Sequence, residues 1–340
     1  MTFQHILFSI EDGVAFLSLN RPEQLNSFNT AMHLEVREAL KQVRQSSDAR
    51  VLLLTAEGRG FCAGQDLSDR NVAPGAEMPD LGQSIDKFYN PLVRTLRDLP
   101  LPVICAVNGV AAGAGANIPL ACDLVLAARS ASFIQAFCKI GLVPDSGGTW
   151  LLPRLVGMAR AKALALLGNR LTAEQAEQWG LIYRCVEDAE LRAEALKLAQ
   201  HLATQPTYGL ALIKRSLNAS LSNSFDEQLD LERDLQRLAD LTMSLIEHEA
   251  HRRSESRLIL DLVRKNERII KNVLDEGREM CAFIDAQHRF LFVNPAYEHY
   301  WTQPRESLIG MHVHELVGQR LYRDVIKAGI NQATSTAAVA

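Results

Sequence analysis

Three short segments rich in glycine and small residues carry groups that could do chemistry. They are GRGFCAGQDL at residues 58–67, NGVAAGAGAN at residues 108–117 and GLVPDSGGTW at residues 141–150. Residues without bulky side chains let a ligand approach the backbone, so that main-chain N–H groups can bind it. N–H groups aimed at a carbonyl oxygen stabilise the negative charge that develops there during reaction. The carboxyl of Asp145, in the third segment, could then move a proton.

Ala63 and a residue near Ala114 are the two candidate N–H donors for one thioester carbonyl oxygen. Ala63 follows a predicted buried strand. Ala114 lies where a helix is expected to begin, and the first N–H groups of a helix have no intrahelical acceptor. With the oxygen held by two donors, the adjacent carbon becomes acidic, because the enolate charge resides on that oxygen. A single carboxylate such as Asp145 can then act as base and afterwards as acid.

Each segment also has a simpler interpretation. The first could be an ordinary turn at a strand exit, and Asp145 could merely cap the helix that follows it. Gly113-x-Gly115 begins like a dinucleotide-binding fingerprint, but Ile118 occupies the third glycine position. A serine-protease role for Ser146 in DSGG fails, because no histidine lies in a matching motif and the chain is not all-β.

The elements that must position these segments alternate between strands and helices. We expect a strand hairpin at residues 4–10 and 14–19, buried strands at 51–57 and 102–107, and helices at 30–44, capped by Thr30, and at 83–98. The polar stretch 68–82 is expected to be a mobile surface segment. Almost all of residues 147–241 are helical in pattern. This order predicts an α/β layer fold with helices added at one end.

The composition is that of a globular protein able to bury a core. Of the 340 residues, 47% are apolar and 22% are charged, and 36 basic against 40 acidic residues give a formal net charge of −4. That balance excludes a strongly basic surface for nucleic acid and an acidic disordered tail. The six cysteines are scattered, which is typical of reduced, buried thiols in the cytosol.

We expect a cytoplasmic protein without membrane contact. The N-terminus lacks the basic start and unbroken apolar run of a signal peptide. The apolar stretch 103–128 is long enough to cross a bilayer, but polar residues that would be costly in hydrocarbon interrupt it. It is better interpreted as a strand, a turn, a buried helix and another strand.

The chain changes character near residue 242. Residues 243–276 form a charged helical stretch with a narrow apolar stripe, which is typical of a two-helix seam and would allow dimerisation. Strand-like runs and short helices follow, and residues 334–340 are expected to be a disordered tail. His312 and His314 could bind a metal ion, but without a third ligand they favour an ordinary surface position, and no metal site is predicted.

Residues 1–241 resemble the crotonase (enoyl-CoA hydratase/isomerase) superfamily. The matching segments, in family order and spacing, are NRPEQLNSFN (20–29), FCAGQDL (61–67), AVNGVAAGAGANIPLACDLVLAA (106–128), GLVPDSGGTWLLPRLVG (141–157) and ALALLGNRLTAEQAEQWGLI (163–182). The resemblance implies a spiral of ββα units and a trimer or dimer of trimers. It also implies an acyl-CoA substrate, in which coenzyme A is part of the substrate and no separate cofactor is needed.

The resemblance further implies which residues form the site. Ala63 and Ala114 would supply the N–H groups of the oxyanion hole, and Asp145 would be the proton carrier. The residues expected to line the acyl-CoA channel are Ala63, Gly64, Gln65, Asp66, Leu67, Gly113, Asn117 and Phe137. Arg21 and Arg59 are candidate neighbours of the CoA phosphates, with a solvent-exposed role equally open.

Two departures from the family pattern favour isomerisation. Hydratases of the family use two glutamates, whose positions are occupied here by Asn117 and Phe137, so a carboxylate pair cannot activate water. The sequence around Asp145 resembles isomerases of ring 1,2-epoxyphenylacetyl-CoA in bacterial phenylacetate breakdown, and enzymes that shift Δ3-enoyl-CoA to Δ2-enoyl-CoA. Phe137 could form an apolar floor that raises the pKa of the Asp145 carboxyl, or simply pack in the core. Hydration with another base, and a non-catalytic sensory or interaction protein, stay as alternatives.

Residues 278–333 resemble the first half of a PAS sensor domain. The matching stretches are CAFIDAQHRFLFVNPAYEHYW (281–301), RESLIGMHVHELVG (305–318) and the helix after them. The later strands of a PAS domain are missing, and no cofactor is assigned to this fragment. We therefore expect an acyl-CoA isomerase domain at 1–242, a linker helix at 243–277 and a truncated α+β fragment at 278–333.

Overall fold

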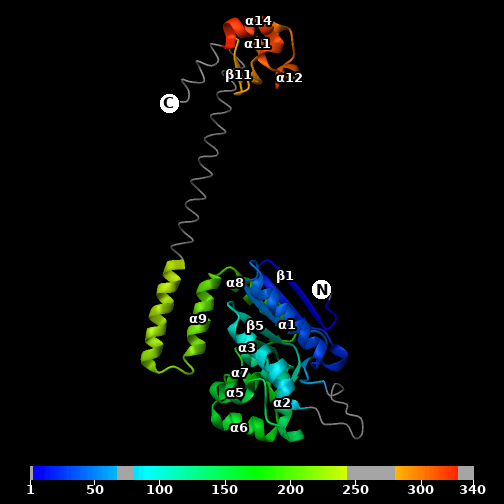
Figure 1. Cartoon of the computed structure of the whole chain (residues 1–340). Helices are drawn as coiled ribbons and strands as arrows, with labels where there is room; N and C mark the ends of the chain where they lie inside the picture. Colours follow the sequence, from blue (N-terminus) through cyan, green and yellow to red (C-terminus); the bar gives the residue numbers. More distant parts are fainter. Residues whose placement is uncertain (1–2, 67–79, 243–279, 328–340) are drawn as a thin grey trace. The chain divides into compact units, whose positions relative to one another are not determined.

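The computed structural model describes residues 3–66, 80–242 and 280–327. Its internal contacts divide the chain into two units, Met1–Thr242 and Met243–Ala340. Figure 1 shows the course of the chain. The predictions of a linker helix and seam at 243–277, of a disordered tail at 334–340 and of a mobile segment up to residue 79 lie outside the described residues.

The first unit is built on a six-stranded sheet. Its strands, in spatial order, are β1 (Ile6–Glu11), β2 (Val14–Leu19), β3 (Val51–Ala56), β5 (Val103–Val107), β7 (Leu124–Ala128) and β10 (Arg184–Val186). β1 and β2 form the predicted antiparallel hairpin, and the other neighbours are parallel. Every residue of β5 is buried, which is typical of a parallel strand covered on both faces.

A second, four-stranded sheet carries the segments with candidate chemistry. Its strands, in order, are β4 (Gly60–Cys62), β6 (Val110–Ala112), β8 (Ser132–Ile134) and β9 (Arg170–Thr172). β4, β6 and β8 are parallel, and each follows a strand of the larger sheet: β4 follows β3, β6 follows β5 and β8 follows β7. Helical segments come after each pair of strands, so the chain is a spiral of ββα units, as the resemblance implied.

The helices follow the sequence pattern with some differences at their ends. They are α1 (Thr30–Gln45), α2 (Leu81–Ser84), a π-helical turn (Ile85–Tyr89), α3 (Asn90–Asp98), α4 (Ala114–Asn117), α5 (Gly148–Val156), α6 (Met158–Leu167), α7 (Ala173–Gln178), α8 (Leu191–Ala203) and α9 (Thr207–Ala219), with further helical residues at 225–242. Stretch 103–128 forms β5, β6, α4, a short 3-10 turn and β7, as interpreted from its sequence.

Two predictions about these elements are wrong in detail. The cap of α1 is Asn29 and not Thr30, because the Asn29 side chain accepts a hydrogen bond from the N–H of Met32. Residues 81–82 belong to α2, which Asp80 caps. The mostly helical stretch 147–241 also contains the strands β9 and β10, which are three residues long and therefore too short to show a periodic pattern.

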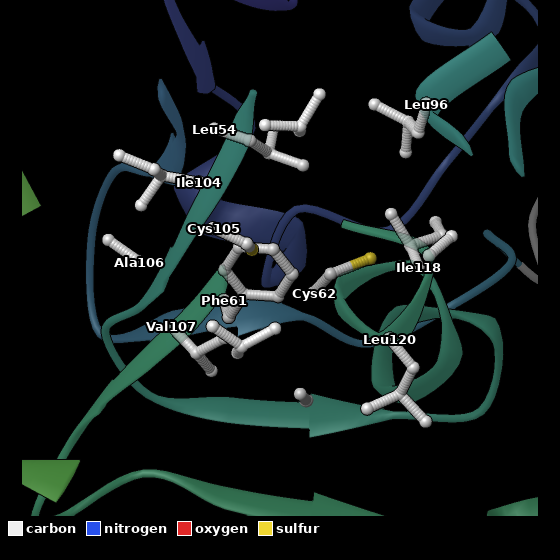
Figure 2. Close-up of a cluster of buried hydrophobic side chains, with 14 of the residues drawn as sticks. Leu54, Phe61, Cys62, Leu96, Ile104, Cys105, Ala106, Val107, Ile118 and Leu120 are labelled. Carbon is white, nitrogen blue, oxygen red and sulfur yellow. The ribbon is translucent and has the colours of Figure 1, made fainter. Parts of the chain in front are cut away.

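The main core lies around strands β3 and β5. Figure 2 shows side chains that β3, β4, β5, α3 and the 118–120 segment bring together, among them Leu54, Phe61, Leu96, Ile104 and Leu120. Cys62 belongs to this cluster, and its burial raises the pKa of the thiol to about 12. All six cysteines are free thiols. None of the helices in the described part of the chain is long and apolar enough to cross a membrane.

The second unit has its own small core. β11 (Ala282–Ile284) and β12 (Phe290–Val293) form the predicted hairpin, followed by α11 (Pro295–Trp301), α12 (Arg305–Leu308), α13 (Val313–Val317), α14 (Gln319–Leu321) and a π-helical turn (Tyr322–Ile326). Its buried apolar residues are Phe290, Val293, Leu308 and Val313. The ring nitrogens Nδ1 of His312 and His314 lie 2.6 Å apart in a hydrogen bond. Within the described ranges, no three His, Cys, Asp or Glu side chains could together hold a metal ion.

Contact between α4 and β4 requires glycine at position 115. A Cβ atom built there would lie 2.2 Å from the carbonyl oxygen of Cys62, so Gly115→Ala must push α4 away from β4. We expect a loss of about 1–3 kcal/mol in the free energy of unfolding, measured by urea denaturation. Gly209→Ala in α9, where the added Cβ would lie 3.8 Å from Pro206, should be neutral or slightly stabilising. Equal stability of the two variants would contradict the backbone contact.

Candidate active site

The turn after β4 uses nearly all of its backbone N–H groups internally. The N–H of Ala63 donates to the carbonyl of Leu25 at 2.9 Å, and that of Asp66 donates to the carbonyl of Phe28 at 2.9 Å. The carbonyl of Gly64 accepts from the N–H of Phe28 at 2.7 Å. Phe28 and Gln65 thus form a parallel β-bridge, in which the N–H of Gln65 points away from Phe28.

The prediction that the Ala63 N–H belongs to an oxyanion hole is therefore wrong, because Leu25 already accepts its hydrogen bond. Among the described residues, the N–H of Gln65 has no acceptor. Gln65 was expected only to line the acyl-CoA channel. The bridge leaves the N–H of Gln65 as the donor of this turn that points away from Phe28.

The second segment forms a tight turn between β6 and α4. Gly113 has a positive φ of 56° and donates its N–H to the carbonyl of Ile134 at 3.0 Å. Ala114 is the first residue of α4, so its N–H has no intrahelical acceptor. In the part of the chain that the structure describes, no other hydrogen bond from this N–H is found.

The two turns touch backbone to backbone at Gly64. A Cβ atom built on Gly64 would lie 3.0 Å from the carbonyl oxygen of Ala112 and 3.4 Å from the nitrogen of Ala114. Gly64 also has a positive φ of 88°, which favours glycine. This contact places the turn that carries Gln65 directly beside Ala114. The pair of donors that the geometry supports is Gln65 and Ala114.

Asp145 is tied to the same helix through Asn117. The side-chain amide of Asn117 donates to the main-chain carbonyl of Asp145 at 2.9 Å, and its oxygen accepts from Nε2 of Gln135 at 2.8 Å. Gly148 packs so closely on this amide that an added Cβ would lie 2.3 Å from Nδ2 of Asn117. The Ser146 hydroxyl donates to Oδ1 of Asp145 at 2.9 Å.

The simpler interpretation of Asp145 was that its side chain merely caps α5, and among the described residues α5 begins without such a side-chain cap. The N-cap residue of α5 is Gly147, and Asp145 contributes its main-chain carbonyl, which accepts from the N–H of Gly148 at 2.9 Å.

Phe137 is buried, and its ring tip would lie 3.8 Å from a Cβ atom on Gly113. Its ring therefore flanks the turn that presents Ala114. The effect of this apolar ring on the pKa of Asp145 stays a prediction.

The residues expected near the CoA phosphates separate into two groups. Arg21 forms an ion pair with Asp66 at 2.8 Å, with only 13% and 10% of the two side chains exposed, and also donates to the carbonyl of Ser27. This ion pair braces the turn, and the phosphate contact of Arg21 and the channel position of Asp66 stay predictions. Arg59 is exposed, and its phosphate contact stays a prediction. Leu67 lies outside the described residues.

Sequence analysis missed an aromatic cluster behind the first turn. The buried hydroxyl of Tyr89 donates to Oε1 of Gln65 at 2.9 Å. The imidazole of His33 packs against the rings of Phe28, Phe88 and Tyr89, with centroid distances of 4.6, 5.1 and 4.5 Å. Burial, and to a lesser extent the charge of Arg37, lower the pKa of His33 to about 3, so the ring is neutral. Tyr89 and Gln65 are 24 residues apart in the sequence, and no local pattern indicates that they touch.

Comparisons with known proteins show the family to which each part of the chain is similar. The family model described as "Enoyl-CoA hydratase/isomerase" matches residues 9–250, and one described as "PAS fold" matches residues 274–340. The 1,2-epoxyphenylacetyl-CoA isomerase of Escherichia coli K12 is 62% identical over 236 residues, which cover 69% of this chain and 90% of that protein. Trans-2-decenoyl-[acyl-carrier-protein] isomerase of Streptococcus mutans is 35% identical over 70% of this chain and 90% of its own.

The solved structures include an enoyl-CoA hydratase from Bacillus anthracis. Its TM-score is 0.65 at 32% sequence identity, and the match covers 69% of this chain and 90% of the hydratase. Relatives named as isomerases and relatives named as hydratases thus share this fold.

The Arg21–Asp66 ion pair should contribute to stability. Arg21→Met removes the cation that pairs with the mostly buried Asp66 carboxylate, so we expect a loss of about 2–4 kcal/mol in the free energy of unfolding, measured in urea. Arg59→Met, at an exposed position, should change it by less than about 0.5 kcal/mol. A stable Arg21→Met variant with a raised KM for acyl-CoA would instead support the predicted contact between Arg21 and the CoA phosphates.

His33 should make the fold sensitive to acid. Its pKa is about 3 in the folded state, below the usual 6.5, so the unfolded chain binds the extra proton first as the pH falls. Stability should decline between pH 6.5 and pH 3, by up to about 4–5 kcal/mol from this residue. Urea denaturation across this pH range should show a shallower decline in His33→Phe. Identical dependence of stability on pH in the two proteins would contradict the lowered pKa of His33.

Proposed function

The chain belongs to the enoyl-CoA hydratase/isomerase family, and on that basis we propose that it isomerises an acyl-CoA thioester with Asp145 as the single proton carrier. The substrate class follows from the family. The assignment to isomerisation rests on one observation above all. Asn117 and Phe137 stand at the two positions where the hydratases that this sequence resembles use glutamates, so Asp145 is the candidate carboxyl of the three described segments.

The proposed reaction begins with the thioester carbonyl oxygen bound by the N–H groups of Gln65 and Ala114. Asp145 removes a proton from the carbon next to the carbonyl, and the electron pair moves to the oxygen to form an enolate. The same carboxyl then returns the proton at a different carbon. From a 3-enoyl-CoA this sequence gives a 2-enoyl-CoA, and no atoms are gained or lost.

The contacts of Asn117 support isomerisation over hydration. Its amide donates to Asp145 and accepts from Gln135, and an amide has no acid or base chemistry at neutral pH. Phe137, at the second glutamate position, has no titratable group. Asn117 therefore holds the main chain of Asp145, and neither Asn117 nor Phe137 can supply the second carboxyl that would activate water.

The preferred substrate in this proposal is a ring 1,2-epoxide of phenylacetyl-CoA. The support is the 62% identity to the E. coli enzyme that is named for this substrate. The aromatic ring of Phe137 beside Gly113 would also suit an aromatic acyl group. A 3-enoyl-CoA is the second substrate class. The proposal includes a cytoplasmic location and assembly into trimers or hexamers, as expected for the family, and needs no cofactor beyond the CoA of the substrate.

Hydration is the second candidate function, because a solved enoyl-CoA hydratase shares the fold. Incubation with crotonyl-CoA separates the two proposals. Loss of the absorbance of the conjugated thioester would show hydration, whereas an isomerase of the proposed type leaves it unchanged.

Replacement of the proton carrier is the direct test. Asp145→Asn keeps a side-chain oxygen that can accept from Ser146 but removes the base, so we expect kcat to fall by about 100-fold to 10,000-fold. Product formation from epoxyphenylacetyl-CoA and from a 3-enoyl-CoA should be followed by chromatography. Binding of acyl-CoA should change little, because the two N–H donors remain.

Asp48→Asn, which alters an exposed aspartate away from the site, is the matched control and should retain activity. Unchanged turnover by Asp145→Asn would refute the proposed role. Absence of isomerisation by the unmodified chain on both substrates would favour hydration or a non-catalytic function.

A further inference from the structure

Tyr89 is the residue that contacts the side chain of Gln65 from behind the site. Its hydroxyl oxygen lies 2.9 Å from Oε1 of Gln65, and its own side chain is 1% exposed. Tyr89 ends the π-helical turn Ile85–Tyr89 between α2 and α3. Such a turn rotates the following residues relative to a regular α-helix, and π-helical turns are frequent at functional sites.

The ring of Tyr89 has little freedom to move. The imidazole of His33 packs on it edge to face at 4.5 Å and 85°, and the ring of Phe28 lies at 6.2 Å. Because burial keeps His33 neutral, this contact does not involve a charge. The aromatic cluster therefore fixes the direction in which the Tyr89 hydroxyl points.

Several other contacts hold the main chain around Gln65. The bridge to Phe28 holds the carbonyl of Gly64 and the N–H of Asp66, and Arg21 holds the carboxylate of Asp66. At Gln65 itself, Nε2 donates to the carbonyl of Asp66 at 3.3 Å, and Oε1 accepts from Tyr89. The hydrogen bond from Tyr89 therefore links the side chain of Gln65 to the helical segment that leads into α3.

We propose that Tyr89 is a positioning residue for catalysis: by holding the side chain of Gln65, it gives the turn a second anchor and so fixes the distance of the Gln65 main-chain N–H from the thioester oxygen. The bridge to Phe28 sets the direction of that N–H, because the Gly64 carbonyl and the Gln65 N–H share one planar peptide unit. The inference rests on the proposed function, because it presumes that a thioester carbonyl binds between Gln65 and Ala114. An oxyanion donor must be preorganised to stabilise developing charge, and a donor that can shift away from the oxygen loses part of that effect. Tyr89 thus acts on the reaction through Gln65 and does not touch the substrate.

Tyr89→Phe removes the hydroxyl and keeps the ring. We expect kcat for isomerisation to fall by about fivefold to tenfold, with KM within about twofold, because the lost alignment matters most when charge develops on the oxygen. Thr95→Val is the matched control, since it removes a partly buried hydroxyl hydrogen bond on α3, from Thr95 to the carbonyl of Pro91 at 2.7 Å. That variant should keep its kcat.

A spectroscopic measurement on the full chain separates this inference from the proposed reaction. Phenylacetyl-CoA with a ¹³C-labelled carbonyl has no epoxide or double bond to isomerise, and its carbonyl stretching frequency in infrared difference spectra reports polarisation by the two donors. The unmodified chain and Thr95→Val should lower this frequency relative to free ligand. Tyr89→Phe should lose at least about half of that lowering.

The outcomes are distinct. A lowered frequency that is the same in Tyr89→Phe, with kcat also unchanged, overturns the inference and leaves the proposed function standing. If the unmodified chain does not lower the carbonyl stretching frequency, both the inference about Tyr89 and the proposed function are overturned. A Tyr89-dependent lowering in a chain that isomerises neither substrate supports the positioning role and refutes the reaction. If Tyr89→Phe does not fold, Gln65→Met removes the acceptor of the same hydrogen bond and must show the same loss, and retention of the full lowering would overturn the inference.

Discussion

The site depends on backbone segments that approach closer than any side chain would allow. Gly115 lies against the carbonyl of Cys62, and Gly64 lies against the turn at Ala112–Ala114. These contacts bring an N–H group from the end of one ββα unit beside an N–H group at the start of the next helix. Hydrogen-bond donors held in a fixed, largely dry position stabilise a developing negative charge without reorganising during the reaction. The glycines are thus a condition for the chemistry, because they permit this arrangement.

The repeating ββα architecture also brings the other segments of the site together. β4, β6 and β8 run parallel in the smaller sheet, so the turns that follow them reach a common edge. The turn after β4 carries Gln65, the turn after β6 carries Ala114, and the segment after β8 carries Phe137 and leads to Asp145. Asn117 then connects α4 to the main chain of Asp145, so that the turn at Ala114 and the segment that carries Asp145 share a hydrogen-bonded link.

Much of this arrangement could be predicted from sequence, and its limits have physical causes. The hairpin, the buried strands and the three segments follow from local patterns of apolar residues and glycine. The choice between Ala63 and Gln65 does not, because it depends on the register of a bridge to Phe28, far away in the chain. The pairing of Arg21 with Asp66 and the contact of Tyr89 with Gln65 are also long-range. The strands β9 and β10 are set by pairing with existing sheets and not by a period of their own.

The central claim is that one thioester oxygen lies between the N–H groups of Gln65 and Ala114, with Asp145 facing the adjacent carbon. A crystal structure of the full-length Asp145→Asn variant with a bound aromatic acyl-CoA tests it most directly. The account predicts that the thioester oxygen lies within hydrogen-bond distance of both nitrogens and that the side chain of residue 145 contacts the carbon beside the carbonyl. An oxygen bound elsewhere, or a residue 145 side chain directed away from that carbon, would contradict it.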